Sequence, residues 1–176
     1  MSTENIIPKP EPVIIEGSFL NRILIPYRDH CRYLKEAFFL YEPERGAEGL
    51  TLTGNCAIDE SCYIDDTGHF NAVEFNICYN QMAYTFLGHT IRYGLIPELA
   101  AYDLPLFFEK QLSHVLISRL SSRYASQLNP RSFKGTFGIS SATVKSKCIF
   151  INTWCSFSDE HSGKSDGEIT LAVLHP

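Results

Sequence analysis

The sequence lacks the short motifs by which many catalytic and cofactor sites are recognised. Its 176 residues contain no C-x-x-C pair, no H-E-x-x-H, no G-x-S-x-G and no glycine-rich phosphate loop. The six cysteines do not have the spacing of metal ligands. We therefore expect reduced, mostly buried thiols, and no metal or other cofactor.

Long apolar runs and an excess of positive charge are also missing. No stretch of about 18 apolar residues occurs, and the polar start Met1–Pro12 lacks the hydrophobic run of a signal peptide. The net charge of −5 argues against a nucleic-acid-binding surface. These features predict a cytoplasmic protein without a membrane span and without a nucleic-acid partner.

The chain does have enough apolar residues for one core. Hydrophobic residues make up 44% of the sequence and charged residues 20%, as in an ordinary globular protein. At this length we expect a single domain over residues 17–176. The preceding residues 1–16 begin with the polar run Met1–Pro12, which contains three prolines, and they are expected to form a flexible N-terminal arm.

Apolar residues in alternation predict an antiparallel sheet interrupted by one long helix. The runs Arg32–Glu42 and Leu50–Ile58 suit a hairpin. A short helix is expected at Asp103–Gln111. Further strands are expected at Ser113–Tyr124, Ser132–Ile139, Lys147–Phe157 and Glu168–Leu174. Helix and strands segregate along the chain, which is typical of the α+β class.

The long helix is expected from Asn71 to Gly88. Asn71 and Glu74 have the spacing of a capping box, and Gly88 suits the left-handed position that follows a helix. Apolar residues fall on two opposite faces, and only a narrow edge at Glu74–Gln81 is polar. A helix that is apolar nearly all round is expected to be buried, so we expect the sheet to wrap around it.

Polar residues gather where this helix begins. His69 lies just before the helix start, where the positive end of the helix dipole disfavours an imidazolium and leaves a neutral ring that can accept a proton. The unpaired N–H groups of the first turn suit a developing oxyanion. A solvent-exposed loop histidine is the alternative for His69. Asn71 is either a cap or a functional residue, and Glu74 is interpreted as a capping residue rather than a catalytic base.

Two further asparagines lie within the helix. Asn76 is expected to bond to neighbouring backbone, because an unpaired buried amide costs about 1–3 kcal/mol. Asn80 lies one turn before Tyr84 inside an apolar stripe, which favours a place in a site. The phenols of Tyr27 and Tyr63 could donate a hydrogen bond to a thioester oxygen, and packing in the core or at its rim is the alternative for each.

Four blocks of the sequence resemble the FcoT-like family. They are IPYRDHCRYL at 25–34, SCYIDDTGHFNAVEFNICYNQMAY at 61–84, SSRYASQLNPRSF at 121–133 and SDGEITLAVL at 165–174. The resemblance covers roughly Tyr27 to Leu174, and TGHFNAVE is its most specific part. It implies a hot-dog fold, in which a curved antiparallel sheet wraps around one long helix. That fold agrees with the one expected from the apolar patterns.

The resemblance also implies chemistry on acyl thioesters. Family members are described as long-chain fatty acyl-CoA thioesterases. Some are assigned to isonitrile lipopeptide biosynthesis, where they add glycine to the β-carbon of a (2E)-enoyl thioester on an acyl carrier protein. We expect this glycine addition, with or without thioester hydrolysis. The alternatives are an acyl-CoA or acyl-carrier-protein thioesterase and a non-catalytic acyl-binding domain. The partners would be glycine and an acyl carrier protein or CoA thioester.

Six positions match the site residues of the family. They are the expected catalytic residues Tyr27, Tyr63, His69 and Asn71 and the expected substrate-binding residues Asn80 and Tyr84. In this hypothesis Tyr63, Asn71 and the helix-start amides stabilise the enolate that forms when glycine attacks. His69 or Tyr27 takes a proton from the glycine ammonium group.

Two expectations remain for groups outside that set. Arg32 and Arg123 adjoin matched blocks and are candidates to hold the glycine carboxylate, although a surface salt bridge is an equal alternative for each. Hot-dog domains generally pair through their sheets, so the resemblance implies a homodimer or higher homo-oligomer. Bulky residues on both faces of Lys147–Phe157 suit a strand packed on two sides or at a subunit interface.

Overall fold

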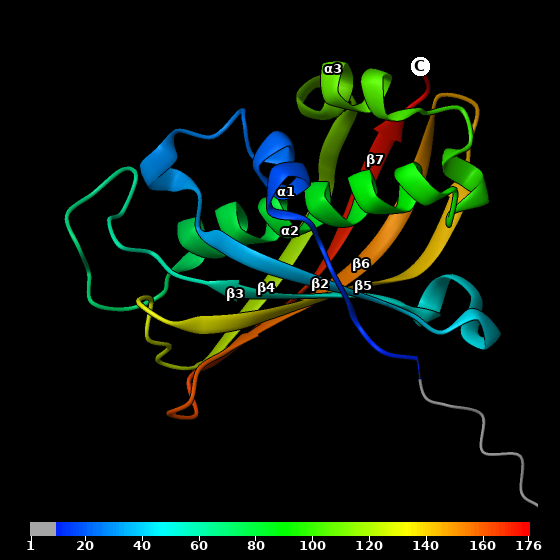
Figure 1. Cartoon of the computed structure of the whole chain (residues 1–176). Coiled ribbons are helices and arrows are strands. Elements are labelled where there is room, and N and C mark those ends of the chain that lie inside the picture. The colour runs from blue at the N-terminus through cyan, green and yellow to red at the C-terminus, as the bar shows by residue number, and fades with distance from the viewer. Residues whose placement is uncertain (1–9) are drawn as a thin grey trace, which may run out of the picture.

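The computed structural model describes residues 10–176 of the chain (Figure 1). Within them, seven strands form one antiparallel sheet in the order β1-β2-β3-β5-β6-β7-β4. The strands are β1 Val13–Ile14, β2 Leu34–Tyr41, β3 Leu50–Cys56, β4 Val115–Ser126, β5 Phe133–Val144, β6 Cys148–Ser158 and β7 Lys164–Leu174. The expected hairpin β2–β3 and the four later strands are confirmed.

Helix α2 spans Ala72–Tyr93 and lies across one face of the curved sheet (Figure 1). Helices α1 (Gly17–Ile23) and α3 (Leu104–His114) pack against α2 on its far side from the sheet. Three 3₁₀ segments connect these elements, at Asp29–Cys31, Pro43–Gly49 and Pro97–Leu99. A curved antiparallel sheet around one long helix is the hot-dog fold, so the expected fold class is confirmed.

The core lies between α2 and the concave face of the sheet. In strand β6, buried and less buried residues alternate along the whole strand, so one face of the strand points into this core. Ile151 and Phe157 point inward and are fully buried. From the helix, Phe86 contacts Phe137 of β5 with ring centroids 4.9 Å apart. Aromatic packing of this kind holds α2 against the centre of the sheet.

The start of α2 follows the sequence prediction closely. The Oδ1 atom of Asn71 accepts hydrogen bonds from the N–H groups of Val73 (2.9 Å) and Glu74 (3.3 Å). The Glu74 carboxylate in turn accepts from the Asn71 N–H at 3.3 Å. This reciprocal pair is the predicted capping box.

The predicted end of α2 was wrong. Gly88 lies inside the helix, and Gly94 takes the left-handed position after it, with φ of 63°. A Cβ on residue 88 would collide with Ile23 of α1 and lie 3.2 Å from Phe107 of α3. Gly88 therefore allows α1 and α3 to approach α2 closely, and does not terminate the helix.

The predicted polar edge of α2 is also buried. Gln81 has no exposed surface. Its Oε1 accepts from the N–H groups of Tyr33 and Leu34, both at 2.9 Å, and its Nε2 donates to the carbonyl of Cys31 at 2.6 Å. Gln81 thus links α2 by hydrogen bonds to the chain around the start of β2. Helical periodicity does not reveal this tertiary role.

The N-terminal segment only partly lies within the described residues. Residues 1–9 of the predicted arm at 1–16 are outside them. Val13–Ile14 forms β1 opposite Phe38 and Phe39 of β2, and the N–H of Ile15 donates to the Ala37 carbonyl at 2.9 Å. The end of the predicted arm is therefore joined to the sheet. None of the helices between residues 10 and 176 has the length and hydropathy needed to span a bilayer.

Candidate active site

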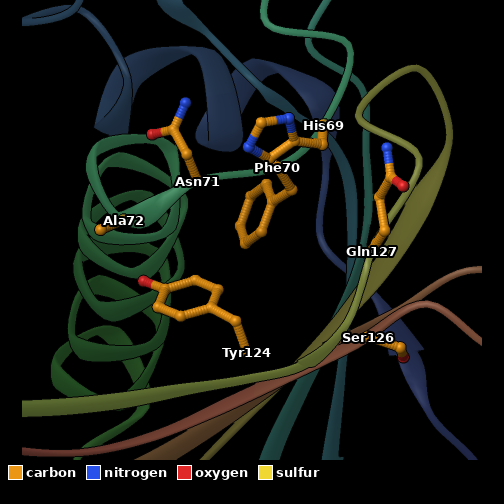
Figure 2. Close-up of a pocket in the computed structure, with 7 residues that line it drawn as sticks. All are labelled: His69, Phe70, Asn71, Ala72, Tyr124, Ser126 and Gln127. Carbon is orange, nitrogen blue, oxygen red and sulfur yellow. The ribbon is translucent and has the colours of Figure 1, made fainter.

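A pocket of about 550 Å³ opens where α2 begins. The chain just before α2, the first turn of α2 and the end of β4 form its walls (Figure 2). Its lining residues are His69, Phe70, Asn71, Ala72, Tyr124, Ser126 and Gln127. Two of the six predicted site residues, His69 and Asn71, therefore share one pocket.

Phe70 forms an apolar wall of this pocket. It is 4% exposed, and its ring centroid lies 5.0 Å from that of Phe133 and 5.2 Å from that of Phe157. The pocket therefore joins the aromatic core directly. Hydrogen bonds beside such a wall are stronger than in bulk water, because the local dielectric constant is lower.

Asn71 lines the pocket, and its side-chain acceptor is already occupied. Its Oδ1 receives the Val73 and Glu74 amides and the Tyr63 hydroxyl, which donates at 3.0 Å. The Nδ2 group has no partner among residues 10–176. Ala72, the first residue of α2, has a backbone N–H with no intrahelical acceptor. Together these groups offer donors to a developing negative charge.

His69 is held in the tautomer that a general base needs. Its Nδ1 lies 3.0 Å from the carbonyl oxygen of Thr67. A carbonyl can only accept, so in the neutral ring the proton is on Nδ1 and the lone pair is on Nε2. The ring is exposed at the mouth of the pocket (Figure 2). Its Nε2 can therefore take a proton from a substrate.

Tyr63 contacts Asn71 but does not line the pocket. Its side chain is 49% exposed, and its hydroxyl proton is committed to the Asn71 Oδ1. The geometry thus gives Tyr63 a role in orienting the Asn71 amide. Direct contact between this phenol and a substrate would require its present hydrogen bond to break.

Arg131 fixes the loop that carries Tyr63 and His69. Its guanidinium donates to the Ile58 carbonyl at 2.7 Å, to the Asp59 carbonyl, and to the Asp66 carboxylate. Asp66 also accepts from the N–H of Gly68 at 2.8 Å. Loop 59–70 contains no helix or strand, so these contacts, rather than repeating secondary structure, set the position of His69.

The other three predicted residues lie outside the pocket, and two of them are farther along α2. At 1.5 Å per residue, Tyr84 is roughly 20 Å along the helix axis from Asn71. Asn80 precedes Tyr84 by one turn and shares its face. Tyr27, in the chain between α1 and β2, lies beside Tyr84. Burial is the main cause that raises the pKa of both phenols. The structure therefore divides the predicted site into two clusters.

The side chains of Glu74 and Asn76 on α2 do not line the pocket. Glu74 is 3% exposed, and burial raises the pKa of its carboxyl, while the hydrogen bond from the Asn71 N–H opposes this. It does not line the pocket, in keeping with a capping residue. The expectation that Asn76 bonds to backbone was wrong for its Oδ1, which is buried without a partner among the described residues.

Neither predicted carboxylate-binding arginine lines the pocket. Arg32 pairs with Asp29 at 3.2 Å and donates to the Tyr27 carbonyl at 3.2 Å. Arg123 pairs with Asp166 across the sheet at 3.0 Å. Both take the salt-bridge alternative. Among residues 10–176, no group of three His, Cys, Asp or Glu side chains is arranged to hold a metal ion.

Sequence reasoning missed the residues contributed by the end of β4 and by the residue that follows it. Tyr124, Ser126 and Gln127 close the side of the pocket opposite α2 (Figure 2). They fall within SSRYASQLNPRSF, one of the blocks that carry the family resemblance. Their place in this block is the sequence feature that could have indicated a role in the site. Their closeness to the start of α2 follows from the sheet order, which periodicity along the chain does not give.

Comparisons with known proteins agree with this architecture. The model of the FcoT-like thioesterase domain family matches residues 22–173. A (2E)-enoyl-[ACP] glycyltransferase of Streptomyces coeruleorubidus is 37% identical over 91% of this chain and 98% of its own length. A protein of the same name from Mycobacterium marinum is 33% identical over 92% of this chain and 88% of its own length.

Solved structures support the fold alone. A sigma28-regulated virulence protein of Campylobacter jejuni superposes with a TM-score of 0.51 at 7% identity. The match covers 90% of this chain and 97% of that protein. At such low identity the shared architecture carries no statement about chemistry.

Proposed function

Because the chain belongs to the FcoT-like thioesterase domain family, we propose that it adds glycine to the β-carbon of a (2E)-enoyl thioester held on an acyl carrier protein. The observation that carries this proposal is the identity of 37% to a (2E)-enoyl-[ACP] glycyltransferase over nearly the whole of both chains. The pocket at the start of α2 supports it, since it holds a base and hydrogen-bond donors side by side.

In the proposed reaction His69 acts on glycine. Its Nε2 removes a proton from the ammonium group, which leaves an amine that attacks the β-carbon. A carbon–nitrogen bond forms, and the electrons of the double bond move onto the thioester oxygen. The proton on His69 then returns to the α-carbon, so that no net acid or base is consumed.

The negative charge on the thioester oxygen is stabilised at the helix start. The Ala72 N–H and the Nδ2 group of Asn71 are the donors on this side of the pocket. Removing one such donor from an enzyme typically lowers kcat by about 10²–10³-fold. Tyr63 contributes through the Asn71 amide that it orients. In this proposal Asn80, Tyr84 and Tyr27 form a separate surface for the rest of the substrate.

Thioester hydrolysis is the second candidate, and the thioesterase description of the matching family favours it. Water would replace glycine, and the same donors would stabilise a tetrahedral oxyanion. Incubation of a short enoyl carrier-protein thioester with and without glycine, followed by mass analysis, separates the two reactions. A glycine adduct on the carrier supports addition, whereas release of free acid at the same rate in both samples supports hydrolysis.

The proposal extends to the setting of the reaction. The family resemblance leads us to assign it to isonitrile natural-product biosynthesis, a branch of lipid metabolism, in the cytoplasm. The six free cysteines are in keeping with a reducing compartment. Detection of the glycine adduct in extracts of cells that contain the gene, and its loss on deletion, would test this assignment.

We also propose that two copies associate through β4. This edge strand is exposed along most of its length, and Leu116, Ile117 and Leu120 are among its exposed apolar residues. Unpaired strand edges of this kind readily pair with another chain. Light scattering should show a homodimer or larger homo-oligomer, and Leu120→Lys should shift it toward the monomer. A wild-type monomer would contradict this part of the proposal.

A further inference from the structure

A second phenol faces the pocket from the sheet. Tyr124 of β4 lines the pocket together with His69 and Asn71, and its side chain is 42% exposed. Its ring packs edge-on against Phe75 of α2, with centroids 5.9 Å apart. Figure 2 shows the Tyr124 ring extending from β4 across the pocket toward the first turn of α2. The hydroxyl is therefore carried toward the helix start from the opposite wall.

The hydroxyl of Tyr124 is available in a way that the hydroxyl of Tyr63 is not. Tyr63 has one proton, and the Oδ1 of Asn71, which can only accept, already receives it at 3.0 Å. The hydroxyl oxygen of Tyr124 instead lies 3.1 Å from the hydroxyl oxygen of Ser122, and either group can be the donor. When Ser122 donates, the proton of Tyr124 is free to point into the pocket.

Two further features suit this phenol to donate a hydrogen bond. Burial raises the pKa of Tyr124, and the hydrogen bond with Ser122 only partly opposes that effect. The hydroxyl therefore keeps its proton at neutral pH. Contact with Phe75 limits the motion of the ring, so the donor is positioned before a substrate arrives.

We propose that Tyr124 is a further catalytic residue, whose hydroxyl donates a hydrogen bond to the thioester oxygen from the sheet side of the pocket. The inference rests on the proposed function. The Ala72 N–H and the Asn71 amide approach the same oxygen from the helix side. As the carbon–nitrogen bond forms and the double-bond electrons move to this oxygen, the Tyr124 hydrogen bond strengthens, and its O–H bond remains intact.

The test compares three conservative substitutions in an assay of glycine addition to an enoyl carrier-protein thioester. Tyr124→Phe keeps the ring against Phe75 and removes only the hydroxyl. It should lower kcat about 10²-fold or more, with a smaller change in KM. Tyr63→Phe should lower kcat less, because it acts through Asn71. Tyr93→Phe, at the far end of α2, is the matched control and should leave kcat unchanged.

The outcomes separate this inference from the proposed function. Wild-type turnover combined with an unchanged kcat in Tyr124→Phe would overturn the role of Tyr124 and leave the proposed function intact. Wild-type protein that turns over no acyl thioester would overturn both. Circular dichroism and thermal melting of Tyr124→Phe should match wild type. If the variant melts early, residual kcat measured well below its Tm still decides the question.

Discussion

Similar side chains lie at the start of helix α2 and in its covered half, in different surroundings. At its start, His69, Asn71 and Tyr124 surround an open pocket. Farther along, Tyr84 and His89 are 8% exposed, and α1, α3 and β2 cover this half of the helix. Each region has a histidine, an amide and a phenol, and the amide of the covered half is that of Asn80. Residue type alone therefore does not identify the reacting end.

The difference lies in which atoms remain available. The Thr67 carbonyl fixes the His69 ring and leaves its Nε2 free, whereas the His89 ring is enclosed between Phe39 (4.2 Å between centroids) and Tyr93 (4.7 Å). Chemistry needs both access and a free donor or acceptor. The start of α2 meets that condition, whereas the covered half of the helix contributes to packing and to the stability of the fold.

The largest effect is expected at the open end. His69→Ala removes the base and should lower kcat for glycine addition by about 10²–10⁴-fold. Steady-state assays would measure this, with His175→Ala, near the C-terminus, as the control histidine. The melting temperature should be nearly unchanged, because His69 is exposed. Full activity in His69→Ala would remove the basis for locating the reaction at this end.

A second substitution separates capping from catalysis at the same position. Asn71→Asp keeps an oxygen to cap Val73 and Glu74, and a negative charge is favourable at a helix start. It removes the Nδ2 donor and places charge near the forming enolate. We expect kcat to fall about 10²-fold while urea unfolding is unchanged. Asn71→Ala should lower the free energy of unfolding as well, by about 1 kcal/mol.

Substitution in the covered half should have a smaller effect on the chemical step. Tyr84→Phe removes the hydroxyl of a residue whose backbone lies roughly 20 Å along α2 from Asn71. We expect a change of less than about tenfold in turnover, mainly through KM, which reports binding equal in ground and transition states. Separate measurement of kcat and KM checks this. A loss of kcat as large as that of His69→Ala would mean that the covered half takes part in bond formation.

The smallest effect on activity, with a distinct effect on stability, is expected at His89. Burial, aided by repulsion from Arg92, lowers the pKa of His89 from 6.5 to about 4. The folded state thus favours the neutral ring. Its contribution to stability is present above pH 6.5 and is lost as pH falls toward 4. His89→Leu should weaken this acid sensitivity in thermal melts at pH 7 and pH 5, with kcat unchanged. An identical loss in both proteins would contradict the assignment.

Local rules predicted the start of α2, and tertiary contacts decided the rest. The capping box at Asn71 and Glu74 depends on residues three apart, so the sequence revealed it. Gly88 misled the prediction of the helix end, because it serves close packing with Ile23. The role of Tyr124 depends on β4 lying beside the start of α2, which requires the strand order of the whole sheet.

The most direct test of the central claim is a single-turnover reaction between an enoyl carrier protein and isotopically labelled glycine, with wild-type protein and His69→Ala side by side. Intact-mass analysis would follow the carrier protein. We predict that wild type increases the carrier mass by one labelled glycine and that His69→Ala does so far more slowly. Release of free acid without label, or equal rates in the two proteins, would contradict glycine addition at the start of α2.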